Sequence, residues 1–242
     1  MKATLKFLAA LAALGAVVVL SSCAISAKPA PARSQQDALR ELHALIRSKD
    51  EIAILFIGNS YSFGVPRELK KLTTRAHRKV RYGEKTHNGW ALARHSTDPT
   101  TLAAIHNGHW DIIVLQEYST HPANPISRET MMVPGIRFLA SEARKHGAIP
   151  ILYQTWGKKN GDPTIPGDTF QTMNQRVRDG YRTASRKAGG LVIVPAGDAW
   201  EKEFESNPDA PFYQPDGHHP TRASDAVTAR VFYETLFAEP AP

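Results

Sequence analysis

The chain has 242 residues, 42% of them hydrophobic and 22% charged, which is typical of a globular protein with one sizeable core. The net charge is +7, but the basic residues are scattered along the chain, which favours solvated helix faces over nucleic-acid binding. Cys23 is the only cysteine, so a disulfide within the chain and a cysteine nucleophile inside the folded domain are both excluded.

The first 22 residues predict an export signal. Two lysines precede an apolar stretch over residues 7–20, which is short for a membrane span. The following Leu20-Ser21-Ser22-Cys23 resembles a bacterial lipobox, in which the cysteine is lipidated and becomes the mature N-terminus. We therefore expect an exported bacterial lipoprotein, anchored in the membrane of the cell envelope through Cys23. A plain signal peptide with an incidental cysteine is the alternative.

Residues 23–36 are rich in Ala, Pro and Ser and predict a tether, and one folded domain follows over residues 37–238. Apolar periodicity and capping residues predict helices at 35–48, 66–77, 100–107, 128–146, 169–188, 196–205 and 221–237. Buried-type apolar runs predict strands at 52–57, 80–86, 111–115, 149–153 and 191–194. This alternation predicts a three-layer α/β fold with a mostly parallel, flavodoxin-like sheet of order 2-1-3-4-5.

A serine follows the first predicted strand directly. The strand ends in Gly58-Asn59-Ser60, and ligands of open α/β sheets bind beyond the carboxyl ends of the strands. Asp216-Gly217-His218-His219-Pro220 lies in a loop before the last predicted helix. Ser60 as nucleophile, His219 as general base and Asp216 as its orienter would form a triad. His218 is the competing base, Asp198 is a rival orienter that could instead cap a helix, and Ser60 could simply cap a turn.

These two segments resemble the motifs of the SGNH (GDSL-like) hydrolase superfamily. Gly58-Asn59-Ser60 stands where the family has Gly-Asp-Ser, and Asp216 to His219 matches its Asp-x-x-His block. The likeness is greatest to an uncharacterised, mostly bacterial branch with Gly-Asn-Ser, Leu-Gln-Glu and Asp-Gly-x-His-Pro blocks. The family spacing selects His219 over His218. The resemblance implies backbone oxyanion donors at Ser60 and Gly89.

The third oxyanion donor is where the chain departs from the family. The usual Gly-x-Asn-Asp block is absent, and the third strand ends in Leu115-Gln116-Glu117. We expect the Gln116 amide either to replace the missing asparagine or to serve as a structural hydrogen-bonding group. Glu117 is expected to pair with an arginine or with a backbone group.

Further residues invite a functional interpretation. His95 could line the pocket, as the family branch suggests, and Trp156 could stack on a sugar ring or pack in the core. The dispersed histidines show no metal-ligand spacing, so we expect no metal and no cofactor.

The sequence therefore predicts an SGNH-type serine esterase. The resemblance implies hydrolysis of small acyl esters, with acetyl groups on carbohydrate first among them, so the partners expected are a small-molecule or glycan ester substrate and the membrane, not nucleic acid. An acyltransferase with the same triad, or a non-catalytic glycan-binding lipoprotein, are the alternatives.

Overall fold

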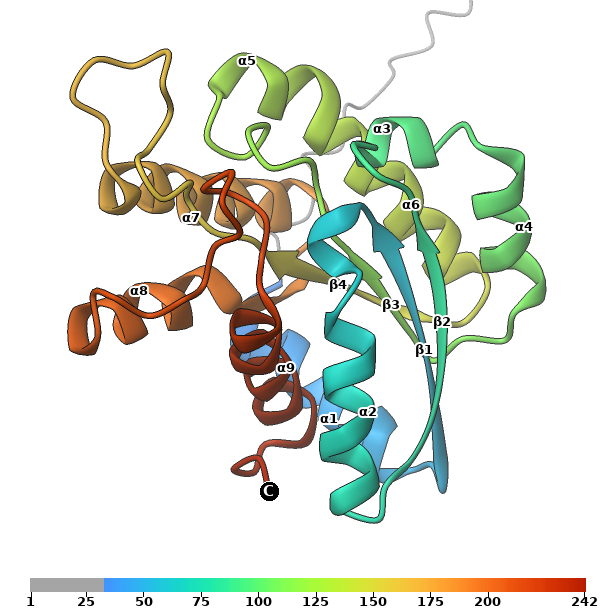
Figure 1. Cartoon of the computed structure of the whole chain (residues 1–242). Helices are drawn as coiled ribbons and strands as arrows, with labels where there is room; N and C mark the ends of the chain where they lie inside the picture. The colour runs from blue at the N-terminus through green and yellow to red at the C-terminus, as the bar shows by residue number, and fades with distance from the viewer. Residues whose placement is uncertain (1–32) are drawn as a thin grey trace, which may run out of the picture. The chain divides into compact units, whose positions relative to one another are not determined.

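A five-stranded parallel sheet forms the centre of the computed structural model, which describes residues 33–242 (Figure 1). The strands are β1 (Glu51–Gly58), β2 (Lys79–Thr86), β3 (Ile112–Leu115), β4 (Ile149–Gln154) and β5 (Val192–Pro195). Their order is β2-β1-β3-β4-β5, and every neighbouring pair is parallel. The predicted fold class and strand order are confirmed. The predicted signal peptide, Cys23 and most of the predicted tether lie outside the described residues.

Helices cover both faces of the sheet. One face packs against α1 (Gln35–Arg47), α2 (Val65–Arg75), α8 (Ala196–Ser206) and α9 (Arg222–Phe237). The other packs against α3 (Leu92–His95), α4 (Pro99–Asn107), α6 (Val133–Lys145) and α7 (Phe170–Lys187). Strand β1 shows why two cores form: Ile54 and Phe56 point into the first, and Leu55 and Ile57 into the second. Such burial on both faces explains the unbroken apolar run of β1.

The predicted helix over 128–146 forms, but its first five residues are π-helical. A short helix α5 (Pro125–Ser127) leads into a π-helical turn (Arg128–Met132), and only then does α6 begin. Pro134 explains the π-helical turn, because it has no N–H to donate and its ring crowds the preceding turn. The sequence also did not predict α3 or the 3-10 turn Ser60–Ser62, which are too short to show a periodic pattern.

None of the helices within residues 33–242 is both long and apolar enough to span a bilayer.

Candidate active site

Two segments from opposite ends of the domain meet at the carboxyl end of β1. Ser60 opens the short turn after β1, and the loop before α9 carries Asp216 and His219. The Oγ atom of Ser60 lies 2.9 Å from Nε2 of His219, and Nδ1 of His219 lies 2.6 Å from Oδ2 of Asp216. The structure therefore brings the three predicted residues into one continuous hydrogen-bonded chain.

Asp216 is held as a carboxylate by its own loop. Partial burial opposes its ionisation, but hydrogen bonds from the backbone amides of His218 and His219 and from the His219 ring outweigh this and keep its pKa well below the usual range. An ionised Asp216 accepts from Nδ1–H of His219, which leaves Nε2 free to accept the Ser60 proton.

The Gln116 side chain hydrogen-bonds to the turn that carries Ser60, through Asn59 and Ser62. This corrects the prediction that Gln116 is an oxyanion donor. It is fully buried, and its Oε1 accepts from the Asn59 amide at 2.8 Å and from the Ser62 hydroxyl at 2.9 Å. Its Nε2 donates to Oδ1 of Asn59 and to the carbonyl of Glu117. With these bonds its amide has no N–H to offer a substrate, so the structural alternative holds. Gly58 leaves room for this contact, because a Cβ there would lie 2.5 Å from Gln116 Oε1.

A small cavity of about 120 Å³ adjoins Ser60 and His219. It is lined by Asn59, Ser60, Tyr61, Asn88, Gly89, Tyr118, Ser119, His218 and His219. Gly89 has a φ of +70°, a left-handed conformation that glycine adopts without strain. In the described part of the chain, neither the Ser60 nor the Gly89 amide donates to a protein acceptor. Both residues line the cavity, so their amides are available to a ligand there.

Two other predicted polar residues act behind the site. His95 is fully buried and does not line the cavity; its ring bonds the Gly58 carbonyl at 2.9 Å and the Thr101 hydroxyl at 3.0 Å. Burial is the main reason its pKa is lowered, so the ring is neutral at pH 7. Glu117 accepts from the amides of Leu92 and Tyr118 and also contacts His121, so its partners are backbone groups and a histidine, not an arginine.

Trp156 and Asp198 do not join the cavity. The Trp156 ring is buried between Tyr61 and Trp200, stacked at centroid distances of 4.8 and 3.7 Å, so core packing is correct and sugar stacking is not. Asp198 bonds Gln154 and Arg178, so it neither orients His219 nor caps α8.

Two groups of potential metal ligands occur among the described residues. Asp216, His218 and His219 form one, and the triad geometry already accounts for it. His106, Glu142 and His146 form the other, on α4 and at the end of α6, and none of them lines the cavity.

Sequence reasoning missed the cavity residues Asn88, Tyr118 and Ser119 and the contact between Tyr61 and His218. No spacing rule relates these positions, which lie on separate loops. Only the adjacency of Asn88 to Gly89 and of Tyr118 to the end of β3 could have suggested them.

A three-layer fold of this strand order, with a serine after β1 and an Asp-x-x-His segment before the last helix, defines the SGNH-type hydrolases, and the chain belongs to that superfamily. It matches a protein of Slackia heliotrinireducens that is provisionally assigned to the SGNH hydrolases, with 26% identity, a TM-score of 0.62, and coverage of 77% of this chain and 99% of that one.

Two further solved structures share the fold. A DUF4886 family protein of Bacteroides uniformis is 18% identical, with a TM-score of 0.67 and coverage of 78% of this chain and 84% of that one. An acetylxylan esterase of Geobacillus stearothermophilus is 18% identical, with a TM-score of 0.56 and coverage of 76% and 94%. No protein-family model matches the sequence, and no curated protein matches it.

Proposed function

We propose that this protein is a serine esterase that hydrolyses small acyl esters. The observation that carries the proposal is the hydrogen-bonded chain from Ser60 through His219 to Asp216, with contacts of 2.9 and 2.6 Å. A free serine hydroxyl is a weak nucleophile, and an adjacent oriented base is what activates it. These three hydrogen-bonded residues lie at the carboxyl end of β1, and open α/β sheets bind their ligands at the carboxyl ends of their strands.

The proposed reaction follows from an ionised Asp216 and a His219 ring whose proton is on Nδ1. Oγ of Ser60 attacks the ester carbonyl carbon while Nε2 of His219 takes the hydroxyl proton, and the carbonyl electron pair moves onto the oxygen. The amides of Ser60 and Gly89 would stabilise that oxyanion. The bond to the alcohol oxygen then breaks, His219 returns the proton to it, and the acyl group stays on Ser60. Water, deprotonated by His219, releases the carboxylic acid by the same steps in reverse.

The cavity favours a short acyl group. Its volume of about 120 Å³ is well below the roughly 300–1,000 Å³ of pockets that enclose drug-sized ligands. It can hold an acetyl group, while the alcohol part of the ester would remain outside, beside the exposed ring of Tyr118. An acetylated carbohydrate fits this arrangement, since an aromatic face can stack on a sugar ring. That two solved structures of the same fold are described as an acetylxylan esterase and a carbohydrate esterase of family 3 supports this substrate class.

The test is turnover of p-nitrophenyl acetate, butyrate and octanoate by the purified protein and by Ser60→Ala. We expect hydrolysis of acetate above the longer esters, and its near-complete loss in Ser60→Ala with an unchanged thermal melt. Ser206→Ala, at the exposed end of α8, is the matched control and should retain full turnover. Wild-type turnover in a folded Ser60→Ala protein would overturn the proposal, and no hydrolysis by the wild type would favour the acyltransferase or the non-catalytic alternative.

A further inference from the structure

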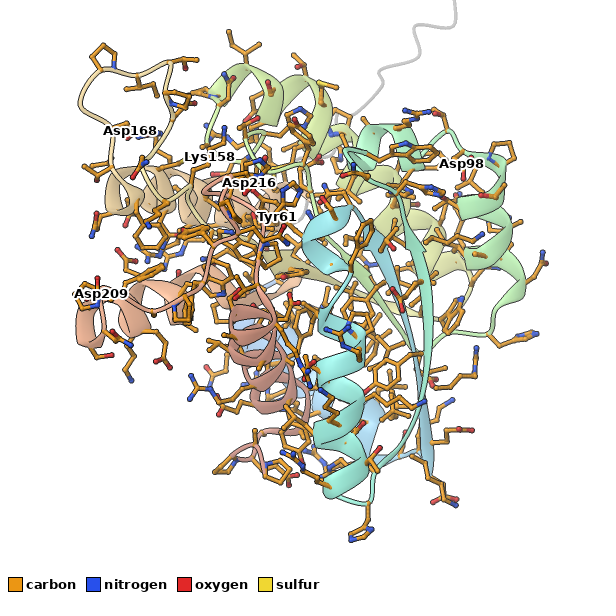
Figure 2. All side chains as sticks on the ribbon, in the orientation of Figure 1. Tyr61, Asp98, Lys158, Asp168, Asp209 and Asp216 are labelled. Atoms are coloured by element: carbon orange, nitrogen blue, oxygen red, sulfur yellow. The ribbon has the colours of Figure 1, made fainter. Side chains whose placement is uncertain are left out.

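The triad is part of a ring of five residues, in which Ser60 and Tyr61 are joined through the backbone. Next to Ser60, the Tyr61 hydroxyl lies 3.2 Å from Nδ1 of His218, the neighbour of His219. Nε2 of His218 in turn faces Oδ2 of Asp216 at 3.7 Å, the oxygen that accepts from His219. The ring therefore runs through Ser60, His219, Asp216, His218 and Tyr61. The peptide bond between Ser60 and Tyr61 closes it, and the His218–Asp216 separation of 3.7 Å is an electrostatic contact and not a hydrogen bond. Figure 2 labels Tyr61 and Asp216 where the loop before α9 meets the turn after β1.

The Tyr61 side of the ring is rigid. Tyr61 is 2% exposed, and its ring stacks on Trp156 with an interplanar angle of 5°. The Tyr153 hydroxyl donates to the Tyr61 carbonyl at 3.2 Å. Nε1–H of Trp156 donates to the carbonyl of His218 at 3.1 Å, so one tryptophan holds both the tyrosine and the backbone of its histidine partner.

The protonation states of Tyr61 and His218 set the direction of the hydrogen bond between them. Burial is the main cause of the raised pKa of Tyr61, so its phenol keeps its proton and can donate. Burial and the nearby His219 lower the pKa of His218 and keep its ring neutral. If Tyr61 donates to Nδ1, the remaining proton of His218 is on Nε2 and faces the Asp216 carboxylate.

We propose that Tyr61 and His218 are positioning residues, which hold the loop with Asp216 and His219 against the nucleophile turn and direct a second imidazole N–H at Asp216. The need for such an arm is visible in the exposure of the loop, since the side chain of Asp216 is 39% exposed. The amides of His218 and His219 fix Asp216 within its own loop, but they do not hold that loop against the turn after β1. The hydrogen bond between Tyr61 and His218 spans the two segments and so sets the distance across which the proton moves. The inference deepens the proposed esterase function and rests on it for its kinetic test.

The kinetic test is a double-mutant cycle on the full-length protein with p-nitrophenyl acetate. Tyr61→Phe keeps the stacked ring and loses the hydroxyl, and His218→Leu loses both ring nitrogens. We expect each to lower kcat roughly two- to tenfold, the range of one neutral hydrogen bond, with KM unchanged. The double variant should be no slower than the slower single one, because both remove the same arm. His218→Asn, whose side chain can accept near the Nδ1 position, should recover much of the Leu variant's loss.

Tyr213→Phe is the matched control. Its hydroxyl donates to the Gly157 carbonyl at 2.6 Å, so it loses one tyrosine hydrogen bond of the same loop outside the ring. We expect a lower melting temperature and unchanged kcat. Wild-type kcat in Tyr61→Phe, losses that multiply in the double variant, or an equal loss of kcat in Tyr213→Phe would each overturn the positioning role.

A readout without turnover separates this inference from the proposed function. In ¹⁵N NMR of the histidine rings near neutral pH, we expect the proton of His218 on Nε2 and that of His219 on Nδ1, with the His218 nitrogens shifted in Tyr61→Phe. A proton on Nδ1 of His218 would overturn the ring as described. If the wild-type protein hydrolyses no ester, the proposed function fails, while the spectrum still decides whether the ring exists.

Discussion

The carboxylate of Asp225 lies directly against the backbone of Gly64. A Cβ atom built on Gly64 would be 1.8 Å from Oδ2 of Asp225, so the acid occupies the space that a larger residue would need. Asp225 is in the first turn of α9, and Gly64 is the N-cap of α2. Burial raises the pKa of Asp225 to about 6, with Glu68 adding to the shift and Arg67 opposing it. Its Oδ1 is buried without a hydrogen-bond partner in the described residues.

Asp225→Asn should stabilise the protein above pH 6. The pKa of Asp225 is about 6 in the folded protein against the ordinary 3.8, so the folded state binds more protons between these values and loses stability as the pH rises. The full cost, about 3 kcal/mol from a difference of two pKa units, is present above pH 6. Urea unfolding at pH 4 and pH 8 measures it: the variant's advantage should grow with pH.

The control for this prediction is Asp209→Asn. Asp209 is exposed (Figure 2), so this substitution removes one negative charge from a carboxylate that is not desolvated in the folded protein. It should leave the pH dependence of unfolding near that of the wild type. An advantage of Asp225→Asn that is equal at the two pH values would show that Asp225 titrates normally.

Gln116→Ala should lower stability far more than turnover. The substitution removes both acceptor contacts under the nucleophile turn and leaves a small cavity, at a cost of roughly 2–4 kcal/mol. Loss of an oxyanion donor would instead reduce kcat by a hundredfold or more. The measurement is the melting temperature together with kcat corrected by active-site titration. A hundredfold loss of titrated kcat in a protein with a normal melt would restore the oxyanion role.

His219→Ala should be far more damaging than His218→Ala. The first removes the base bonded to Ser60, which we expect to reduce kcat by roughly a thousandfold or more, whereas the second removes only a positioning contact. Turnover of p-nitrophenyl acetate by both variants, each checked for folding by circular dichroism, gives the ranking. Equal losses would move the base to His218.

If the lipobox resemblance is correct, Cys23→Ser should turn a membrane-associated protein into one that is soluble or retained with its signal uncleaved. The lipobox resemblance of residues 20–23 predicts that Cys23 becomes the mature N-terminus, and its thiol is the group to which the lipid would attach. Fractionation of cells and the intact mass of the mature protein test the anchor. Unchanged fractionation and an N-terminal mass without lipid would show that the segment is a plain signal peptide.

The sequence determined most of the fold because its signals are local. The buried run of β1 and the capping residue Thr221 each mark an element on their own, and alternation then fixes a parallel sheet. Ser60 was found in the same way, because it directly follows the end of β1, whereas Asp216 was found by the Asp-x-x-His spacing in the loop before α9. The ring through His218 was not, because it depends on how two loops 157 residues apart in the chain meet.

Gln116 shows why residue type and position are insufficient at a strand end. An amide after β3 could point into the cavity or under the neighbouring turn, and the two differ only by the side-chain direction. Gly58 leaves the space that allows the second choice, and the buried amide of Asn59 provides its partner. The direction of the Gln116 side chain thus depends on its contacts with the end of β1 and the turn that follows. No sequence pattern within β1 or β3 shows these contacts.

The separation of Ser60 and His219 along the chain has a consequence for how the site appears during synthesis. A nascent chain that has completed β1 to β5 carries the serine and the whole sheet, yet it holds no base until the loop before α9 has emerged and docked on Tyr61. Reactivity of Ser60 toward a serine-directed phosphonate would thus report when the loop before α9 has docked. A polypeptide cut between β5 and α9 would remain unreactive until the missing C-terminal segment was added in trans.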